Sequence, residues 1–446
     1  MTSAKAGLLA IALLIGVASA SLGMESAPPV VSQSISVSHA VAIALKNSPR
    51  IVSQSSMATA AEARAGMAKA MTRPKLTTTT FATTGTMPSI MAGVPGVDPQ
   101  AIISTPDTRQ YDQNLMAMYP IYTGGRLNAQ WRAARSLSKS AQADTGAMKL
   151  DVALDAKTAY RAALLASKFV EAYQNRVDES TERLRIANAA FEEGKIAKYD
   201  LLRNQTELAE AQQALISSQR DVEMALIDLK TALGVSLESS LTLTDQLAAQ
   251  SAPGALADFA ATALKQRPEV SAARARVDSA KAGVSAAKGA YSPQVYAVAM
   301  QDFVSVSGTG SDNGYTVGIT AGFPIVDGGQ RKSATKEAKA MEQQAEADLR
   351  SVELQVNKEV ASAWVQAQSA AKAVELARAA VDQADEDYRV IKLRYEAGKA
   401  INVEVLDALA SLTKARTNVA QAQYESSVAQ DRLERAEGII QGVSTK

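Results

Sequence analysis

Alternating apolar and polar residues predict four strands in this chain. From Tyr315 to Phe323 every second residue is apolar and those between are small or polar, which indicates a strand over about 314–323 with one apolar and one polar face. Its partner is predicted at 294–304, with the glycine- and serine-rich stretch 305–314 as the hairpin loop. Weaker alternation in the first half predicts strands over about 75–84 and 109–119.

A seven-residue pattern predicts long, paired helices. After Gly194 large apolar residues recur every seven positions, and alanine or serine fills the second seam position; the large ones are Leu201, Leu208, Leu215, Val222 and Leu229. The same register runs through 405–436. Large residues alternating with alanine indicate a coiled coil with closely spaced backbones. The partner helices are predicted over 126–191 and 330–395, and each would be roughly 100 Å long.

The chain contains one unit twice. Prolines bracket an alanine-rich helical stretch at 50–73, and both recur 219 positions later around 269–292. The glycines Gly194 and Gly398, in contrast, are 204 positions apart. The difference of fifteen residues falls in the second hairpin and predicts a loop that is free to vary. Repetition on this scale indicates one supersecondary unit used twice within a single body.

The N-terminus has the pattern of a secretory signal peptide over 1–20. Lys5 supplies the positive charge, 7–17 the apolar run, and the small residues 18–20 the cleavage motif. The apolar run is shorter than the roughly twenty residues of a membrane-spanning helix. The rest divides into a first repeat, an equatorial linker and a second repeat, at 21–233, 234–255 and 256–446.

The composition argues against several classes of function. A net charge of +1 without a basic stripe gives no reason to expect a nucleic-acid partner. The absence of cysteine excludes structural disulfides and a cysteine-linked lipid. His39 is the only histidine and is expected at the surface before the first helix, and the glycine-rich stretch 308–314 lacks the Gly-Lys-Ser/Thr ending of a phosphate loop. We therefore expect no catalytic residue, no cofactor and no metal site.

The predicted strands need further copies of the chain. Strands of nine to eleven residues suit a tilted crossing of an outer membrane. Four strands cannot close a barrel, because the smallest known barrels have eight. Open strand edges are not tolerated in lipid, so other chains must supply the remainder. The expected fold class is mainly α with a small β part.

With these elements in place, the chain resembles the TolC-type outer-membrane efflux proteins, the exit ducts of tripartite efflux pumps and type I secretion systems. Its most specific marks are two tip motifs, Phe191-x-x-Gly194-x-x-x-x-x-Asp200-x-Leu202 and Tyr395-x-x-Gly398-x-x-x-x-x-Glu404-x-Leu406. The resemblance implies a homotrimer in the outer membrane, whose twelve strands form one barrel continuous with a long coiled-coil α-helical barrel in the periplasm. It also implies a periplasmic adaptor protein and, indirectly, a proton-driven or ABC-type inner-membrane pump.

The resemblance assigns roles to the tip residues. Gly194 and Lys195, with Gly398 and Lys399, would form the turns that contact the adaptor, although glycine also serves simply to end a helix.

A pore constriction, or gate, is implied at the same tips. Glu404 and Asp407 would face the pore, where a threefold axis makes rings of like charge that favour cations; an ordinary solvated helix face is the alternative. Asp200 and Tyr395 match a pair that closes the tip by hydrogen bonding.

Two departures from the family pattern concern this gate. Ala400 stands where the best-known members carry an arginine, and Arg203 is the counterpart of Asp407 in the other repeat. Relative to the family pattern, we therefore expect the closed tip to be latched less tightly, or to be latched through Arg203 or Lys399.

The leading hypothesis is a passive, trimeric conduit across the outer membrane, with drugs, metal ions and polypeptides all open as cargo. A periplasmic structural coiled-coil protein is the alternative; it would explain the heptads but not the alternating strands. An exported hydrolase is disfavoured, because no nucleophile and base occur together in a recognisable pattern.

Overall fold

A computed structural model describes residues 29–85, 108–248, 250–306 and 310–439. The signal peptide and the loop of the first hairpin predicted above lie outside these residues. Each repeat runs through two short helices, a strand hairpin, a long helix and a medium helix. Equivalent helices are equally long, with 11, 22, 67 and 36 residues. The first repeat comprises α1 (Val37–Asn47), α2 (Pro49–Ala70), β2 (Lys75–Gly85), β3 (Thr108–Tyr122), α3 (Arg126–Glu192) and α4 (Lys198–Leu233). The second comprises α5 (Leu256–Gln266), α6 (Pro268–Gly289), β5 (Gln294–Val306), β6 (Gly310–Gly322), α7 (Gln330–Glu396) and α8 (Asn402–Glu437).

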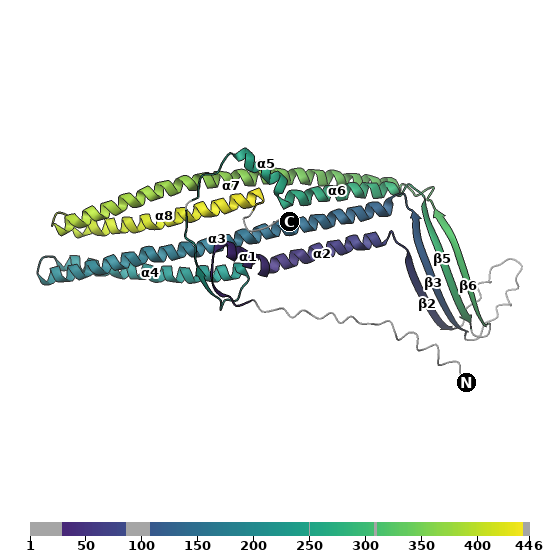
Figure 1. Cartoon of the computed structure of the whole chain (residues 1–446), viewed down its shortest axis with the longest axis horizontal. Coiled ribbons are helices and arrows are strands. Elements are labelled where there is room, and N and C mark those ends of the chain that lie inside the picture. Colours follow the sequence, from purple (N-terminus) through teal and green to yellow (C-terminus); the bar gives the residue numbers. More distant parts are fainter. Residues whose placement is uncertain (1–28, 86–107, 249, 307–309, 440–446) are drawn as a thin grey trace, which may run out of the picture.

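The helices form a shaft with the sheet at one end (Figure 1). The 67-residue helices α3 and α7 run roughly 100 Å along it. Helices α2 and α4 lie end to end beside α3, and α6 and α8 take the same places beside α7. Helix α6 also packs against α3, and α8 contacts α3 as well. The two repeats are therefore interleaved in one body.

The coiled-coil seam is covered unequally in the two repeats. In α8 most seam positions are buried, among them Val405, Leu412 and Leu433. In α4 Leu229 is buried, whereas the large seam residues nearer the tip, from Leu201 to Val222, are only half-buried. One chain alone does not cover that part of α4.

One antiparallel sheet joins the hairpins of both repeats, in the order β2-β3-β5-β6. The central pair, β3 and β5, comes from different repeats, and β2 and β6 are left as edges. The register between β3 and β5 shifts between Pro120 and Tyr122, where a bulge accommodates the proline that lacks an amide donor.

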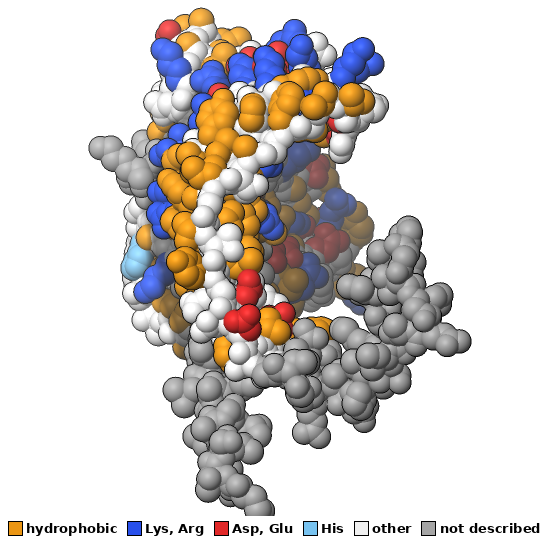
Figure 2. All heavy atoms as spheres, turned by 90° about the vertical axis from the view of Figure 1, so that its right-hand side faces the viewer, with side chains coloured by type: hydrophobic (Ala, Val, Ile, Leu, Met, Phe, Trp, Pro, Cys, Tyr) orange, Lys and Arg blue, Asp and Glu red, His pale blue; other side chains and the backbone are white. Residues whose placement is uncertain are grey.

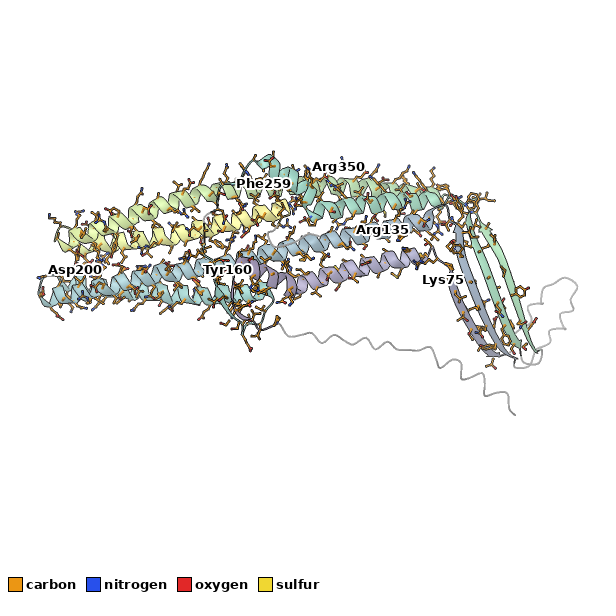
Figure 3. All side chains as sticks on the ribbon, viewed as in Figure 1. Lys75, Arg135, Tyr160, Asp200, Phe259 and Arg350 are labelled. Atoms are coloured by element: carbon orange, nitrogen blue, oxygen red, sulfur yellow. The ribbon has the colours of Figure 1, made fainter. Side chains whose placement is uncertain are left out.

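Packing at mid-shaft involves the inter-repeat linker. Strand β1 (Ser32–Ile35) pairs in parallel with β4 (Ser240–Leu243) of the linker. The fully buried Tyr160 donates its hydroxyl hydrogen to the Ile35 carbonyl at 2.8 Å, and burial raises the pKa of this phenol. Trp364, 204 positions later, donates to the Gly254 carbonyl at 2.7 Å. Both aromatic side chains thus tie the connecting segments to a long helix, and Figure 3 marks Tyr160 at this level.

Charged side chains also join the two repeats at mid-shaft. The carboxylate of Asp431 on α8 lies 3.2 Å from the Lys157 ammonium of α3 and is also paired with Arg161. Lys157 reaches Glu434 at 2.7 Å as well. The Asp431 side chain is only 2% exposed, so these charges are paired within the packed interior of the shaft.

The structure differs from the sequence-based expectation at the second hairpin. The stretch 305–314 was predicted as a loop, but β5 continues to Val306 and β6 begins at Gly310. Ser305 pairs with Ser311, and Val304 pairs with Asp312. Glycine and serine signalled a turn, yet the ladder needs only backbone donors and acceptors, which these residues also supply.

Two short helices were also missed. His39 was expected before the first helix but lies exposed within α1, and α5 occupies the equivalent place in the second repeat. Each has 11 residues, too few for the periodicity that revealed the longer helices. The helices predicted at 50–73 and 269–292 begin on the prolines themselves, since the first helical turn needs no amide donor.

Candidate functional site

Both long helices end at the tip in the same glycine-based turn. Gly194 has φ +73° and Gly398 has φ +72°, the left-handed region where glycine carries no steric cost. In each turn the glycine amide donates at 2.9 Å to the carbonyl three residues back, and the following lysine amide donates at 2.8 Å to the carbonyl five residues back. This is a Schellman motif. Lys195 and Lys399 are exposed just beyond it.

The predicted gate carboxylates lie near these turns. Glu404 is half-buried and Asp407 is exposed, on neighbouring positions of α8. Within the described part of the chain, no lysine or arginine nitrogen lies within 4.0 Å of either carboxylate. Asp200 lies half-buried in the first turn of α4, at the tip of the other repeat (Figure 3).

One chain does not bring the predicted latch pair together. Among the described residues, no hydrogen bond joins Asp200 to Tyr395. The Tyr395 ring instead lies 5.8 Å from the Arg183 guanidinium. Arg203 donates to the Tyr199 hydroxyl at 2.9 Å, one turn away on its own helix. Within one described chain, Asp200 and Tyr395 are thus not paired, and Arg203 is engaged on its own helix.

Other polar residues join the two helix pairs near the tip, and sequence reasoning missed them. The Tyr388 hydroxyl donates to the Glu179 carboxylate at 2.7 Å, and Lys392 lies 3.5 Å from the same carboxylate. Burial raises the pKa of Tyr388, and its bond to Glu179 raises it further. Arg183 donates through Nη2 to Asn402 Oδ1 at 2.7 Å. These contacts link α3 to α7 and α8 within one chain.

A signal for these contacts was present in the sequence. Comparing the repeats singled out Arg203 because its counterpart is acidic. The same comparison applies to Arg183, whose counterpart 204 positions later is Asp387, and to Tyr388, whose counterpart is Leu184. At these two positions, the difference between the copies coincides with a contact that the equivalent residue does not make in the described chain.

The sheet at the other end of the shaft has one apolar face. Cross-strand partners share a face, and the register aligns Ile319 with Ala297 and Tyr119, and Val317 with Ala299 and Ala117. Tyr315, Val317 and Ile319 are 85%, 75% and 72% exposed. Figure 2 shows apolar side chains gathered along this end of the molecule.

The opposite face of the sheet is more polar. It carries Asn114, which donates to Asp302, with Gly314 next in register. Thr77, Met116, Met300 and Thr316 form the neighbouring row. A sheet with one apolar face and an opposite face of mixed character fits a wall between lipid and water.

Nothing in the described residues points to bound metal or to a helical membrane anchor. No three His, Cys, Asp or Glu side chains there come together as metal ligands. No described helix combines the length and the hydropathy needed to cross a membrane.

The family comparison covers both repeats. A family model described as "Outer membrane efflux protein" matches residues 40–235 and 260–438.

Three curated relatives have nearly the same sequence identity to this chain. The alkaline protease secretion protein AprF of Pseudomonas aeruginosa is 25% identical over 292 residues, covering 63% of this chain and 60% of AprF. The outer membrane efflux protein BepC of Brucella suis is 24% identical over 260 residues, covering 58% and 56%. The chain thus matches less than two thirds of the length of either relative. The pyoverdine export outer membrane protein OpmQ of Pseudomonas putida is 24% identical over 403 residues, covering 89% and 84%.

Solved structures share the fold over most of the chain. The outer-membrane channel OprN has a TM-score of 0.75 at 21% identity and covers 90% of this chain and 89% of its own. The Campylobacter jejuni CmeC outer membrane channel has a TM-score of 0.74 at 18% identity, with coverage of 90% and 85%.

Proposed function

The chain belongs to the outer membrane efflux protein family, and from this we propose that it forms the outer-membrane exit duct of a tripartite efflux or type I secretion system. The family match confirms the resemblance drawn from the tip motifs and the repeat. The observation that carries the proposal is the sheet, with one exposed apolar face, at the end of a shaft roughly 100 Å long. Substrates would pass through passively from an inner-membrane pump, because the duct itself supplies no driving force.

A homotrimer is proposed because a single chain leaves surfaces that need covering. The edges β2 and β6 present unpaired backbone donors and acceptors, which lipid does not tolerate. Three copies would supply twelve strands and close the sheet. The seam of α4 near the tip is half-buried in one chain, and a neighbouring copy of the shaft would cover it.

An adaptor protein in the periplasm is the proposed partner at the tip. Gly194 and Gly398 shape two equivalent turns, and each presents an exposed lysine, Lys195 or Lys399. Because the two turns share one backbone geometry, the hairpin tips of an adaptor would meet the same turn at both repeats, although the neighbouring side chains differ.

Glu404 and Asp407 are proposed as the pore constriction, with Asp200 and Tyr395 as a latch between neighbouring chains. Trimerisation would repeat each carboxylate three times around the axis and create a cation-attracting ring. The exposure of Asp407 and the absence of a cation beside it in the described chain support this.

The proposal is tested first by cellular fractionation. The mature chain should enter the outer-membrane fraction and migrate as a heat-modifiable oligomer in gels. Full recovery as a soluble periplasmic protein would refute the channel and favour the structural coiled-coil alternative.

Planar-bilayer recordings test the gate. Asp407→Asn should lower the preference for cations, whereas Asp221→Asn, which removes an exposed carboxylate about 30 Å further along the shaft, should not. Asp200→Ala and Tyr395→Phe should each raise single-channel conductance. Unchanged conductance in both would rule out this latch.

A further inference from the structure

A small pocket with a mostly apolar lining and a few polar groups lies where the two helix pairs meet above the tip. It has a volume of about 40 Å³ and is lined by residues of α3, α4, α7 and α8, including Arg183, Lys392, Tyr395 and Asn402. A single water molecule needs roughly 10–15 Å³. The pocket therefore has room for a small occupant.

Two residues that line this pocket carry buried polar atoms without a hydrogen-bond partner in the described part of the chain, namely Arg183 Nε and Asn402 Nδ2. Ser180 Oγ, one turn before Arg183 but outside the pocket lining, is likewise without one. Arg183 is 8% exposed, Asn402 4% and Ser180 2%. A buried donor without an acceptor costs about 1–3 kcal/mol, so unfilled donors clustered in one place indicate a missing acceptor.

The unpartnered atoms of Arg183 and Asn402 can only donate hydrogen bonds. Asn402 Oδ1 accepts from Arg183 Nη2 at 2.7 Å, and because a guanidinium can only donate, this bond fixes which end of the amide is Nδ2. The unpartnered atoms of both pocket-lining residues are therefore donors. Asn402 is also the first residue of α8, and its N-cap residue Ile401 makes no side-chain capping bond, so free helix amides lie nearby.

Of the two cations that line the pocket, Lys392 is paired with Glu179 and Arg183 has no carboxylate partner in the part of the chain that the structure describes. In the described residues no carboxylate oxygen lies within 4.0 Å of the Arg183 guanidinium. Glu179 is already engaged by Tyr388 and Lys392. Glu396 lines the pocket but is exposed, so water screens its charge. A buried, unpaired cation is expensive unless a counter-charge is present.

We propose that this pocket binds a small inorganic anion of the halide class, held by Arg183 Nε and Asn402 Nδ2. A halide accepts several hydrogen bonds at once and needs no donor of its own, which matches the unfilled atoms. Bound there, it connects α3 of the first repeat to α8 of the second at the level of the tip. The site is independent of conduction and does not rest on the proposed channel function.

Bromide provides a direct probe of the site. Crystals of the full-length mature protein in detergent, soaked in sodium bromide, should show an anomalous peak between Arg183 and Asn402. Density that refines as water only, or a side chain of a neighbouring chain filling the pocket, would overturn the proposal.

The thermal unfolding midpoint tests binding in solution. Chloride at ten times its dissociation constant should raise the midpoint by about 1–2 °C relative to gluconate at equal ionic strength. Equal midpoints in the two salts would overturn the proposal. This holds even if the crystals show a bromide peak, because the peak would then reflect binding at crystal concentration only.

Two variants distinguish this site from general salt effects. Asn402→Asp supplies Arg183 with a built-in carboxylate, so the midpoint should no longer depend on chloride. Arg185→Gln removes an exposed arginine of α3 that is paired with Glu182, and it should keep the full chloride response. A full chloride response in Asn402→Asp would refute the site without requiring an Arg183 variant that folds.

Discussion

Replacing Asp431 by asparagine should destabilise the shaft more than the loss of an exposed ion pair would. The carboxylate is 2% exposed, 3.2 Å from Lys157 and paired with Arg161, whose side chains are 7% and 15% exposed. Asp431→Asn would leave Arg161 without a carboxylate, whereas Lys157 keeps Glu434 at 2.7 Å. Breaking a buried pair costs about 3–5 kcal/mol, and because Lys157 stays paired we expect about 3 kcal/mol.

The expected shift in melting temperature follows from the length of the chain. An unfolding entropy of roughly 2.1 cal/mol/K per residue, summed over 446 residues, is about 0.9 kcal/mol/K. If the chain unfolds as one unit, the midpoint followed by helical circular dichroism should fall by about 3 °C. Asp155→Asn is the matched control, because Asp155 and Arg50 pair at 2.6 Å but are 55% and 54% exposed; it should shift the midpoint by less than about 1 °C.

A double-variant cycle separates loss of the ion pair from loss of packing. Combining Asp431→Asn with Arg161→Gln should cost clearly less than the sum of the two single changes, because the second change removes the cation left unpaired by the first. Additive losses, or a shift for Asp431→Asn no larger than that of the control, would show that the buried charges do not hold the two repeats together.

Two further predictions concern the tip and the response to acid. Gly398→Ala places a side chain at φ +72° and should cost about 1–2 kcal/mol in thermal unfolding. Gly66→Ala, at an open position in the last third of α2, should be neutral or stabilising; equal effects would deny the turn its conformational role. Burial is the largest single influence on the pKa values of Glu269 and Glu359 and raises them, but the hydrogen bonds and positive charges of Arg267 and Arg435, together with the other hydrogen bonds to each carboxylate, outweigh it and hold both pKa values below their usual range. The stability that these two carboxylates contribute is fully present above the unfolded-state pKa near 4.3 and is lost as the pH falls through their lower folded-state pKa values, so the thermal midpoint should drop in acid. Glu359→Gln should weaken this pH dependence. An unchanged fall of the midpoint in acid would contradict the assignment.

Local patterns in the sequence were enough to indicate most of the secondary structure. The helix predicted at 126–191 spans Arg126–Glu192, and the one at 330–395 spans Gln330–Glu396. Periodicity suffices there because each helix turns one face to a long partner over many turns. It failed for α1 and α5, which are too short to show a period, and at 305–314, where residue types typical of a turn continue the strands.

The sequence alone determined the internal repeat, the long helices and the existence of two strand hairpins, because these follow from regular spacing along one segment. The tertiary structure decided which side chains meet across the repeats. Arg183 and Asn402 are 219 residues apart, and Lys157 and Glu434 are 277 apart. Such pairs depend on the offset and rotation of α3 against α8, which no single segment encodes. The unfilled donors at the tip and the buried charges at mid-shaft therefore emerged only once both repeats were packed together.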